Sequence, residues 1–351
     1  MASLYNKAGV VRIYQGHRRT GLVYAIAWSP DGTAIASTSA NSGHMPGPIR
    51  PSSFRISPIE SVRPSPRIRE KWERIDDRVH VWNPLTGKGI ATYSRHVNAV
   101  MSIDFSPSGR QIATACYDGT VHVWSLTTAA STQLTYRGHL EAPTVTEFQL
   151  RAGHVHVLSA RWSPDGQRIA SVGGDDVRVW NPNTRRTMMT IPWSNRFGES
   201  TVGWSSDGSY LAFREFDSVR IVDGTSGAKR TDMLGGIYTF DWSPRSLQIA
   251  TAGEKVRVWD ALTGQMIRQF GTDTDGFARS ISWSWDGAFL AVGGPDPVVR
   301  VWEARSARQV CVYDLHHGWI QDLAWSPDGK YIASGGADRE VHVWQTDLYR
   351  A

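Results

Sequence analysis

The stretch Trp-Ser-Pro-Asp-Gly occupies residues 28–32, and the same five residues recur at 162–166 and 325–329. Four looser copies keep the aromatic residue or the turn, and they begin at Phe105, Trp204, Trp242 and Trp283. Each copy precedes a short apolar run, a turn, and a second run that in most copies ends in Val-x-Val-Trp. Internal repetition of this kind decides the fold before any other feature of a sequence. The chain is therefore built from seven copies of one unit.

The repeat has the period of a propeller blade. From Trp162 onward the copies are 42, 38, 41 and 42 residues apart, which is typical of a four-stranded blade. The runs at 79–82 and 121–124 alternate with the two-residue period of a strand. Pro-Asp-Gly provides a tight turn, because proline fixes φ and glycine tolerates positive φ. We predict an all-β chain folded as a single seven-bladed propeller.

These repeats resemble the WD40 repeat family over essentially the whole chain, from about Val10 to Trp344. In that family the outer strand of the last blade comes from the N-terminus. Residues 11–17 fit this role, because they end in Tyr-x-Gly-His like the outer-strand segment at 133–139. The resemblance implies a ring that is closed by the N-terminal strand and has no free sheet edges at the closure. The near-identical copies favour a bacterial source.

Residues 1–9 have no place in this scheme. Residues 3–9 resemble a cloning-vector scar, so we expect a tag-like or disordered start at 1–9 and the propeller over 10–351.

The composition is typical of a folded protein outside the secretory route. The chain has 351 residues, of which 40% are hydrophobic and 20% charged, and this excludes a disordered chain. Two cysteines can form at most one disulfide bond, which excludes a secreted protein whose fold depends on disulfides. No apolar stretch approaches the ~18 residues of a membrane span, and the start lacks the apolar core of a signal peptide. We expect a cytoplasmic, monomeric protein.

The resemblance implies a buried hydrogen-bond network of His, Ser or Thr, Asp and Trp in each complete blade. The candidate sets are His96, Thr114, Asp118 and Trp124 in blade 2, His316, Ser334, Asp338 and Trp344 in blade 7, and His17, Ser37, Asp76 and Trp82 in blade 1. Blades 3 to 5 have shorter turns, and blade 4 has Phe213 and Val222 at network positions. A hydrolase triad would use the same residue types, but a set that repeats blade by blade indicates a structural role.

Two insertions interrupt the repeats, at about 40–75 in the second-to-third-strand loop of blade 1 and at about 140–153 before blade 3. The first holds six prolines and has a net charge of +4, out of +5 for the chain. Its arginines include Arg50, Arg55, Arg63, Arg67 and Arg69. The segment is either a solvated loop or an electrostatic arm for an acidic partner. Its few aromatic residues make nucleic acid a poor candidate.

In WD40 proteins both enlarged loop types emerge on the same face, the top of the propeller. The resemblance places ligand-contacting positions of this face at Tyr24, Met101, Tyr117, His156, Phe216, Tyr238, Phe277, Arg279, Trp319 and Gln321. Aromatic rings around a channel mouth suit the binding of a protein or peptide. The alternative is that several of these rings are half-buried under loops.

The motifs contain no convincing cofactor or metal site. His316-His317 suggests metal binding, but His316 has the network spacing, and no cysteine or carboxylate cluster accompanies it. Asp104, Asp241 and Asp322 approach the channel from different blades and are interpreted as hydrated rather than catalytic. We therefore expect a non-catalytic protein-binding scaffold or sensor. The alternatives are a propeller enzyme that uses the channel and a sensor domain cut from a larger signalling protein.

Overall fold

The computed structural model describes residues 6–7, 9–17, 21–40, 78–127, 132–140, 156–174, 176–193, 200–271 and 278–348. The arginine-rich segment lies outside these residues, and so do Asp76, Phe277 and most of the second insertion. All regular elements in the described part are strands, so it contains no helix that could cross a membrane.

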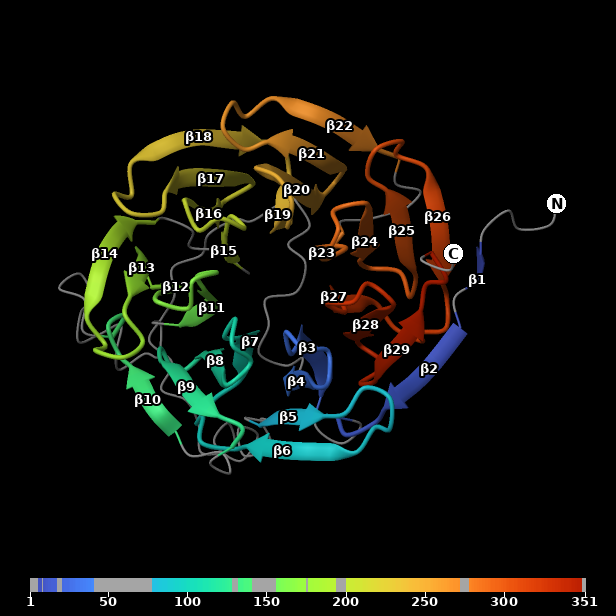
Figure 1. Ribbon diagram of the computed structural model, residues 1–351, viewed down its shortest axis with the longest axis horizontal. Helices are drawn as coiled ribbons and strands as arrows, with labels where there is room; N and C mark the ends of the chain where they lie inside the picture. Colours follow the sequence, from blue (N-terminus) through green and yellow to red (C-terminus); the bar gives the residue numbers. More distant parts are fainter. Residues whose placement is uncertain are drawn as a thin grey trace, which may run out of the picture.

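The described strands form seven radial sheets around a central axis (Figure 1), as the repeats predicted. Blades 1 to 3 consist of β3 (Leu22–Trp28), β4 (Ile35–Ala40), β5 (Val79–Trp82) and β6 (Gly89–Tyr93); β7 (Val100–Phe105), β8 (Gln111–Cys116), β9 (Val121–Ser125) and β10 (Thr132–Tyr136); and β11 (Val157–Trp162), β12 (Ile169–Gly173), β13 (Asp176–Trp180) and β14 (Thr187–Pro192).

Blades 4 to 6 consist of β15 (Val202–Trp204), β16 (Tyr210–Glu215), β17 (Ser218–Asp223) and β18 (Lys229–Leu234); β19 (Ile237–Trp242), β20 (Gln248–Gly253), β21 (Val256–Asp260) and β22 (Met266–Phe270); and β23 (Ser280–Trp283), β24 (Phe289–Gly293), β25 (Val299–Glu303) and β26 (Gln309–Tyr313). Blade 7 consists of β27 (Ile320–Trp325), β28 (Tyr331–Gly336), β29 (Val341–Gln345) and the N-terminal β2 (Gly9–Tyr14).

The repeated Ser-Pro-Asp-Gly stretch forms the turn between the two innermost strands of a blade. In blade 1 the Ser29 hydroxyl donates to Asp31 Oδ1 at 2.6 Å and accepts the backbone N–H of Ala34 at 2.9 Å. Gly32 has φ of 71°, a conformation that disfavours any residue with a Cβ. Ser29, Asp31 and Gly32 thus each have a separate role in the turn, which explains why these residue types recur.

The N-terminal strand closes the ring. Strand β2 is antiparallel to β29, with Val10 opposite Trp344 and Tyr14 opposite Val341. The Tyr14 ring then stacks on Trp82 of blade 1, with centroids 4.4 Å apart and planes at 3°. This places the outer strand of blade 7 in direct contact with the third strand of blade 1, and the predicted closure is confirmed.

The start of the chain differs from our expectation. Asn6–Lys7 forms β1, which pairs in parallel with β26 of blade 6, and Gly9 is the first residue of β2. The segment that precedes the closing strand lies beside the unpaired outer edge of the neighbouring blade. Pairing with that edge satisfies the hydrogen-bonding groups of its backbone. Residues of the segment 1–9 therefore take part in two sheets.

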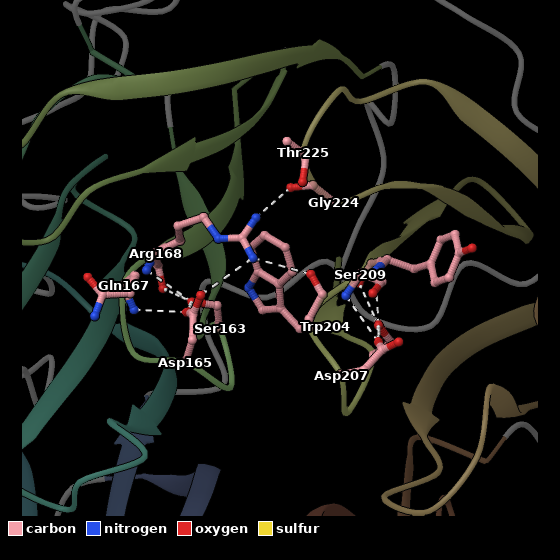
Figure 2. Close-up of polar contacts among 12 residues, drawn as sticks. Ser163, Asp165, Gln167, Arg168, Trp204, Asp207, Ser209, Gly224 and Thr225 are labelled. Atoms are coloured by element: carbon pink, nitrogen blue, oxygen red, sulfur yellow. Dashed lines mark hydrogen bonds and ion pairs between the residues drawn. The ribbon is translucent and has the colours of Figure 1, made fainter.

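The apolar core lies between neighbouring blades. In the contact of blades 1 and 2, Val81 and Tyr93 pack with Ile103, Phe105 and Trp124. Figure 2 shows that polar contacts also join blades 3 and 4, where the Arg168 guanidinium group lies 4.5 Å from the centroid of the Trp204 ring. The same group donates to the carbonyl oxygens of Gly224 at 2.8 Å and Gly208 at 3.2 Å. Arg168 therefore ties blade 3 to the blade that departs most from the repeat.

The predicted network is complete in blade 7. His316 donates from Nδ1 to Asp338 Oδ2 at 2.6 Å and bonds Ser334 Oγ through Nε2 at 2.8 Å, and Trp344 Nε1 donates to the same hydroxyl at 3.1 Å. Burial alone would raise the pKa of Asp338, but the hydrogen bond from His316 brings this pKa below its usual value. In blade 1, His17 and Trp82 both bond Ser37 at 2.8 and 3.0 Å, while Asp76 lies outside the described residues.

Blade 3 holds a network that the sequence did not predict. His139 lies 2.8 Å from Ser171 and 2.9 Å from Asp176, and Trp180 donates to Ser171 at 3.1 Å. The shorter turn brings Asp176 to the required place from the first position of a strand. The Tyr-x-Gly-His ending at His139 was the signal that could have revealed it.

Blade 2 departs from the expected pattern. His96 Nε2 lies 2.7 Å from Thr114 Oγ1, but His96 Nδ1 is 3.9 Å from Asp118, too far for a hydrogen bond. Trp124 Nε1 is buried without a hydrogen-bond partner. The network predicted for this blade is therefore only partly formed.

Removal of the closing strand should destabilise the whole ring. Deletion of residues 1–16 exposes the edge of β29 and apolar surface under Tyr14, so we expect a loss of several kcal/mol in the free energy of unfolding at ~25 cal/mol per Å² of apolar surface. Thermal unfolding measures the effect. Deletion of residues 1–8, which retains β2, is the control. Equal melting temperatures for the two deletions would contradict closure by β2.

We expect Asp338, in the network of blade 7, to contribute more to the free energy of unfolding than Glu254, its counterpart in blade 5. Asp338→Ala leaves the buried His316 Nδ1–H unpaired, so we expect a loss of ~1–3 kcal/mol in the free energy of unfolding. Glu254→Ala, at the corresponding exposed position, should change it by no more than ~0.5 kcal/mol. Denaturant titration of both variants checks this, and similar losses would rule out the assignment.

Candidate functional site

We define the top face as the side on which the inner strands begin. The register Leu22 opposite Ala40, Val100 opposite Cys116 and Ile320 opposite Gly336 places the ends of the second strands on the same side. Both loops that contain insertions therefore start from this face. A central cavity of about 590 Å³ is lined by residues of the inner strands of all seven blades.

Four of the predicted top-face residues line this cavity: Tyr24, Met101, Arg279 and Gln321. Tyr24 and Met101 are buried, because they pack with Ala40 and Ala99 in a small apolar cluster over blades 1 and 2. On the other side of the mouth, Arg279 Nη1 donates to Gln321 Oε1 at 3.1 Å and joins blades 6 and 7. These side chains form a fixed rim.

The remaining predicted residues differ in exposure. Tyr117 and His156 stack on each other, with ring centroids 3.4 Å apart, and His156 Nδ1 donates to the Tyr117 carbonyl oxygen at 2.8 Å. Tyr238 is half-buried beside the Arg214 guanidinium group, which lies 5.0 Å from its ring centroid. Only Phe216 and Trp319, with exposed fractions of 51% and 43%, stand clear of the described surface. Most of the predicted residues that the structure describes are therefore buried or half-buried, which agrees better with the alternative in our prediction than with free exposure.

The channel carboxylates act as braces between blades. Each accepts a backbone N–H from the next inner strand: Asp104 from Trp162 at 2.7 Å, Asp241 from Trp283 at 2.8 Å, and Asp322 from Ile26 at 2.8 Å. A position near the channel was expected for these residues from the sequence, but their role as acceptors between blades was not. The inter-blade bond depends on which strands become neighbours, and that information is absent from a single repeat.

Burial raises the pKa of all three carboxyl groups. The value is about 6 for Asp104, about 7 for Asp241 and about 6 for Asp322, and the charge of Arg161 counteracts the increase. Arg161 is held by Ser102 Oγ, which accepts from its Nη1 at 2.7 Å. The channel therefore contains carboxyl groups that ionise near neutral pH, and the guanidinium groups of Arg161 and Arg279 are among its described lining residues.

The pH dependence of stability should change when Asp241 can no longer ionise. Its pKa in the folded state lies above the ordinary 3.8, so its stabilising contribution is complete below about pH 4 and is lost as the pH rises toward 7. Asp241→Asn keeps an acceptor for Trp283 and removes this loss. We expect the stability of the variant relative to wild type to increase from pH 4 to pH 7.5.

Denaturant unfolding at several pH values provides the measurement. The difference between variant and wild type is the quantity to follow, because His122 and His342, whose pKa is lowered by burial to about 4, have the opposite pH dependence and cancel in it. A difference that is constant with pH would contradict the assignment.

Comparison with known proteins supports the repeat assignment directly. The family profile WD40 (WD domain, G-beta repeat) matches residues 9–43, 87–125, 132–181, 264–303 and 308–345, which is more than half of the chain. The unmatched stretches include most of the insertion in blade 1. They also include the whole of blade 4, where the repeat is weakest.

Three curated relatives show the range of proteins that share the repeats. A transcriptional corepressor, LEUNIG_HOMOLOG of Arabidopsis thaliana, is 24% identical over 62% of this chain and 26% of its own length. The COMPASS component SWD3 of Saccharomyces cerevisiae is 26% identical over 42% of this chain and 48% of its own. A guanine nucleotide-binding protein subunit beta of Oryza sativa subsp. indica is 27% identical over 71% of this chain and 56% of its own.

The chain therefore spans 26 to 56% of the length of these relatives. All three come from eukaryotes, so the bacterial source inferred from the near-identical repeats stays a prediction. The profile matches, the seven described sheets and the repeated Trp-Ser-Pro-Asp-Gly turns agree with one another, and the chain belongs to the WD40 repeat family.

Proposed function

We propose that this protein is a non-catalytic scaffold that binds a protein or peptide across the top face of the propeller. The names of the relatives, a corepressor, a complex component and a G-protein subunit, are consistent with such a role. The arginines of the insertion at about 40–75 favour a partner with acidic groups. Cytoplasmic location and a monomeric state remain predictions from the sequence.

The observation that carries the proposal is an exposed tryptophan on a hydrogen-bonded backbone, directly before the innermost strand of blade 7 on the top face. Trp319 is 43% exposed, while its carbonyl oxygen accepts from the backbone N–H of Ala337 at 3.0 Å. The next residue, Ile320, is buried and donates to the Gly294 carbonyl oxygen at 2.8 Å. A large ring on an ordered backbone can bind a partner with little loss of conformational entropy.

The conformation of Phe216 supports the same face. Its φ of 55° lies in the left-handed region, which is unfavourable for a residue with a bulky side chain. The turn is held by the Ser218 hydroxyl, which donates to the Glu215 carbonyl oxygen at 2.7 Å, and by Ile237, which donates to the Asp217 carbonyl oxygen at 3.0 Å. Backbone strain that is maintained to expose an aromatic ring is typical of binding sites.

The channel favours a structural role over a catalytic one. Each of its three raised-pKa carboxyl groups is occupied by a backbone N–H of the neighbouring blade. A general base needs its oxygen within reach of a substrate proton, whereas these oxygens hold the ring together.

The proposal is tested with two tryptophans of nearly equal exposure on opposite faces. Trp319 lies on the top face, and Trp285, which is 41% exposed, lies in an inner turn on the opposite face. We expect Trp319→Ala to weaken capture of a partner from lysate of the source organism by about 30-fold, which corresponds to ~2 kcal/mol for a binding hot spot. Trp285→Ala should leave capture unchanged.

Quantitative mass spectrometry of captured proteins, with melting temperatures to confirm folding, provides the readout. Phe216→Ala extends the test to the opposite side of the ring. Capture that depends on Trp285 but on neither Trp319 nor Phe216 would place the binding surface on the opposite face and refute the proposal.

A further inference from the structure

Three potential metal ligands meet in blade 2. His96 lies in the connection between β6 and β7, Cys116 is the last residue of β8, and Asp118 follows in the next turn. Their ligand atoms all lie within 4.8 Å of one another. His96 and Cys116 are buried, and Asp118 keeps 13% of its side chain exposed. The cluster is thus nearly dry but can be reached from the top face.

One nitrogen of His96 has no hydrogen-bond partner. His96 Nε2 lies 2.7 Å from the Thr114 hydroxyl, whereas Nδ1 is buried, unpartnered and close to the other two ligands. In the tautomer that carries its proton on Nε2, Nδ1 presents a lone pair to the cluster. A buried polar atom without a partner is costly, and a metal ion would satisfy it.

The other two ligands are oriented by neighbours, as metal ligands usually are. The backbone N–H of Asp118 points to Cys116 Sγ at 3.5 Å. Asp118 Oδ1 accepts from the backbone N–H and the hydroxyl of Thr120 at 2.9 and 2.6 Å. Its Oδ2 is the oxygen nearest to His96 Nδ1, at 3.9 Å. His96 and Asp118 therefore each have one polar atom held by the protein and one close to the cluster, and the single Sγ of Cys116 also donates to the Asn98 carbonyl oxygen at 3.3 Å.

The equivalent position in blade 7 shows what is special about blade 2. His316, Asp338 and His342 also lie close together, but all four ring nitrogens are hydrogen-bonded, those of His342 to Tyr313 and Glu340. Blade 7 has Gly336 where blade 2 has Cys116, and a Cβ on Gly336 would lie 1.9 Å from the Trp319 carbonyl oxygen. In blade 2 the cysteine is thus itself the third ligand. The histidine and aspartate beside it are not joined by a hydrogen bond, unlike those of blade 7.

We propose that His96 Nδ1, Cys116 Sγ and the Asp118 carboxylate bind a divalent transition metal ion of the zinc class, with a water molecule as the fourth ligand. Nitrogen, sulfur and oxygen donors in one small site suit Zn²⁺. On binding, the thiol releases its proton to solvent, a sulfur–metal bond forms, and the hydrated ion loses water molecules. Thiolate and carboxylate together balance the charge of the ion.

Tyr117 lies between two of the ligands and stacks on His156 of blade 3, so the ion would also fix a turn of the top face.

The test uses the full chain, stripped of metal with a chelator and titrated with Zn²⁺ by calorimetry and with Co²⁺ by absorption spectroscopy. Cys116→Gly is the decisive variant, because the equivalent positions of blades 3, 5 and 7 are Gly173, Gly253 and Gly336. Cys311→Ala removes the other cysteine, which is also buried and outside any disulfide, and is the matched control.

We expect one equivalent of Zn²⁺ to bind the wild type and the Cys311→Ala variant, and the affinity of Cys116→Gly to be at least about 100-fold lower. The Co²⁺ form should show a thiolate charge-transfer band that is absent from Cys116→Gly. His96→Gln should behave like Cys116→Gly if it folds. Failure of the wild type to bind one equivalent, or equal binding by Cys116→Gly, would overturn the proposal.

Discussion

The pairing of the N-terminal strand with the last repeat is the interaction on which the rest of the structure depends. Six blades are completed by residues that follow each other in the chain, but blade 7 takes its outer strand β2 from the start of the chain. The same segment carries Tyr14, which stacks on Trp82 of blade 1. The pairing thus joins the two ends of a repeat array and removes the edges at which such an array would fray or aggregate.

Within the closed ring, local departures from the repeat carry the properties that distinguish one blade from another. The third strands of blades 1, 2 and 7 read Val-His-Val-Trp, whereas those of blades 3, 5 and 6 read Val-Arg-Val-Trp. In blades 2 and 7 this histidine stacks on the network histidine; in blades 3 and 6 the arginine pairs with an aspartate of its own blade. Cys116 in place of a glycine belongs to the same class of change. A rigid frame tolerates such variation because each blade contacts only its neighbours.

The sequence predicted the fold almost completely and the candidate site only in part. Period and turn chemistry are local properties, so the strands and the blade number could be inferred from them, and the resemblance to the WD40 family implied the closing role of residues 11–14. The burial of Tyr24, the inter-blade bonds of Asp104, Asp241 and Asp322, and the network around His139 depend on distances between strands remote in sequence. The pairing of Asn6–Lys7 with blade 6 could not be anticipated either, because two residues contain no periodic signal.

Hydrogen exchange tests the central claim, that β2 makes blade 7 a complete blade and the ring a single rigid body. Strand β21 of blade 5 lies between two partners within its own repeat, whereas β29 obtains its second partner only from the N-terminus. If the account is correct, peptides that cover β29 exchange their amide hydrogens as slowly as those that cover β21, and with the same dependence on denaturant. Exchange of β29 at the rate of an unpaired edge, while β21 stays protected, would contradict it.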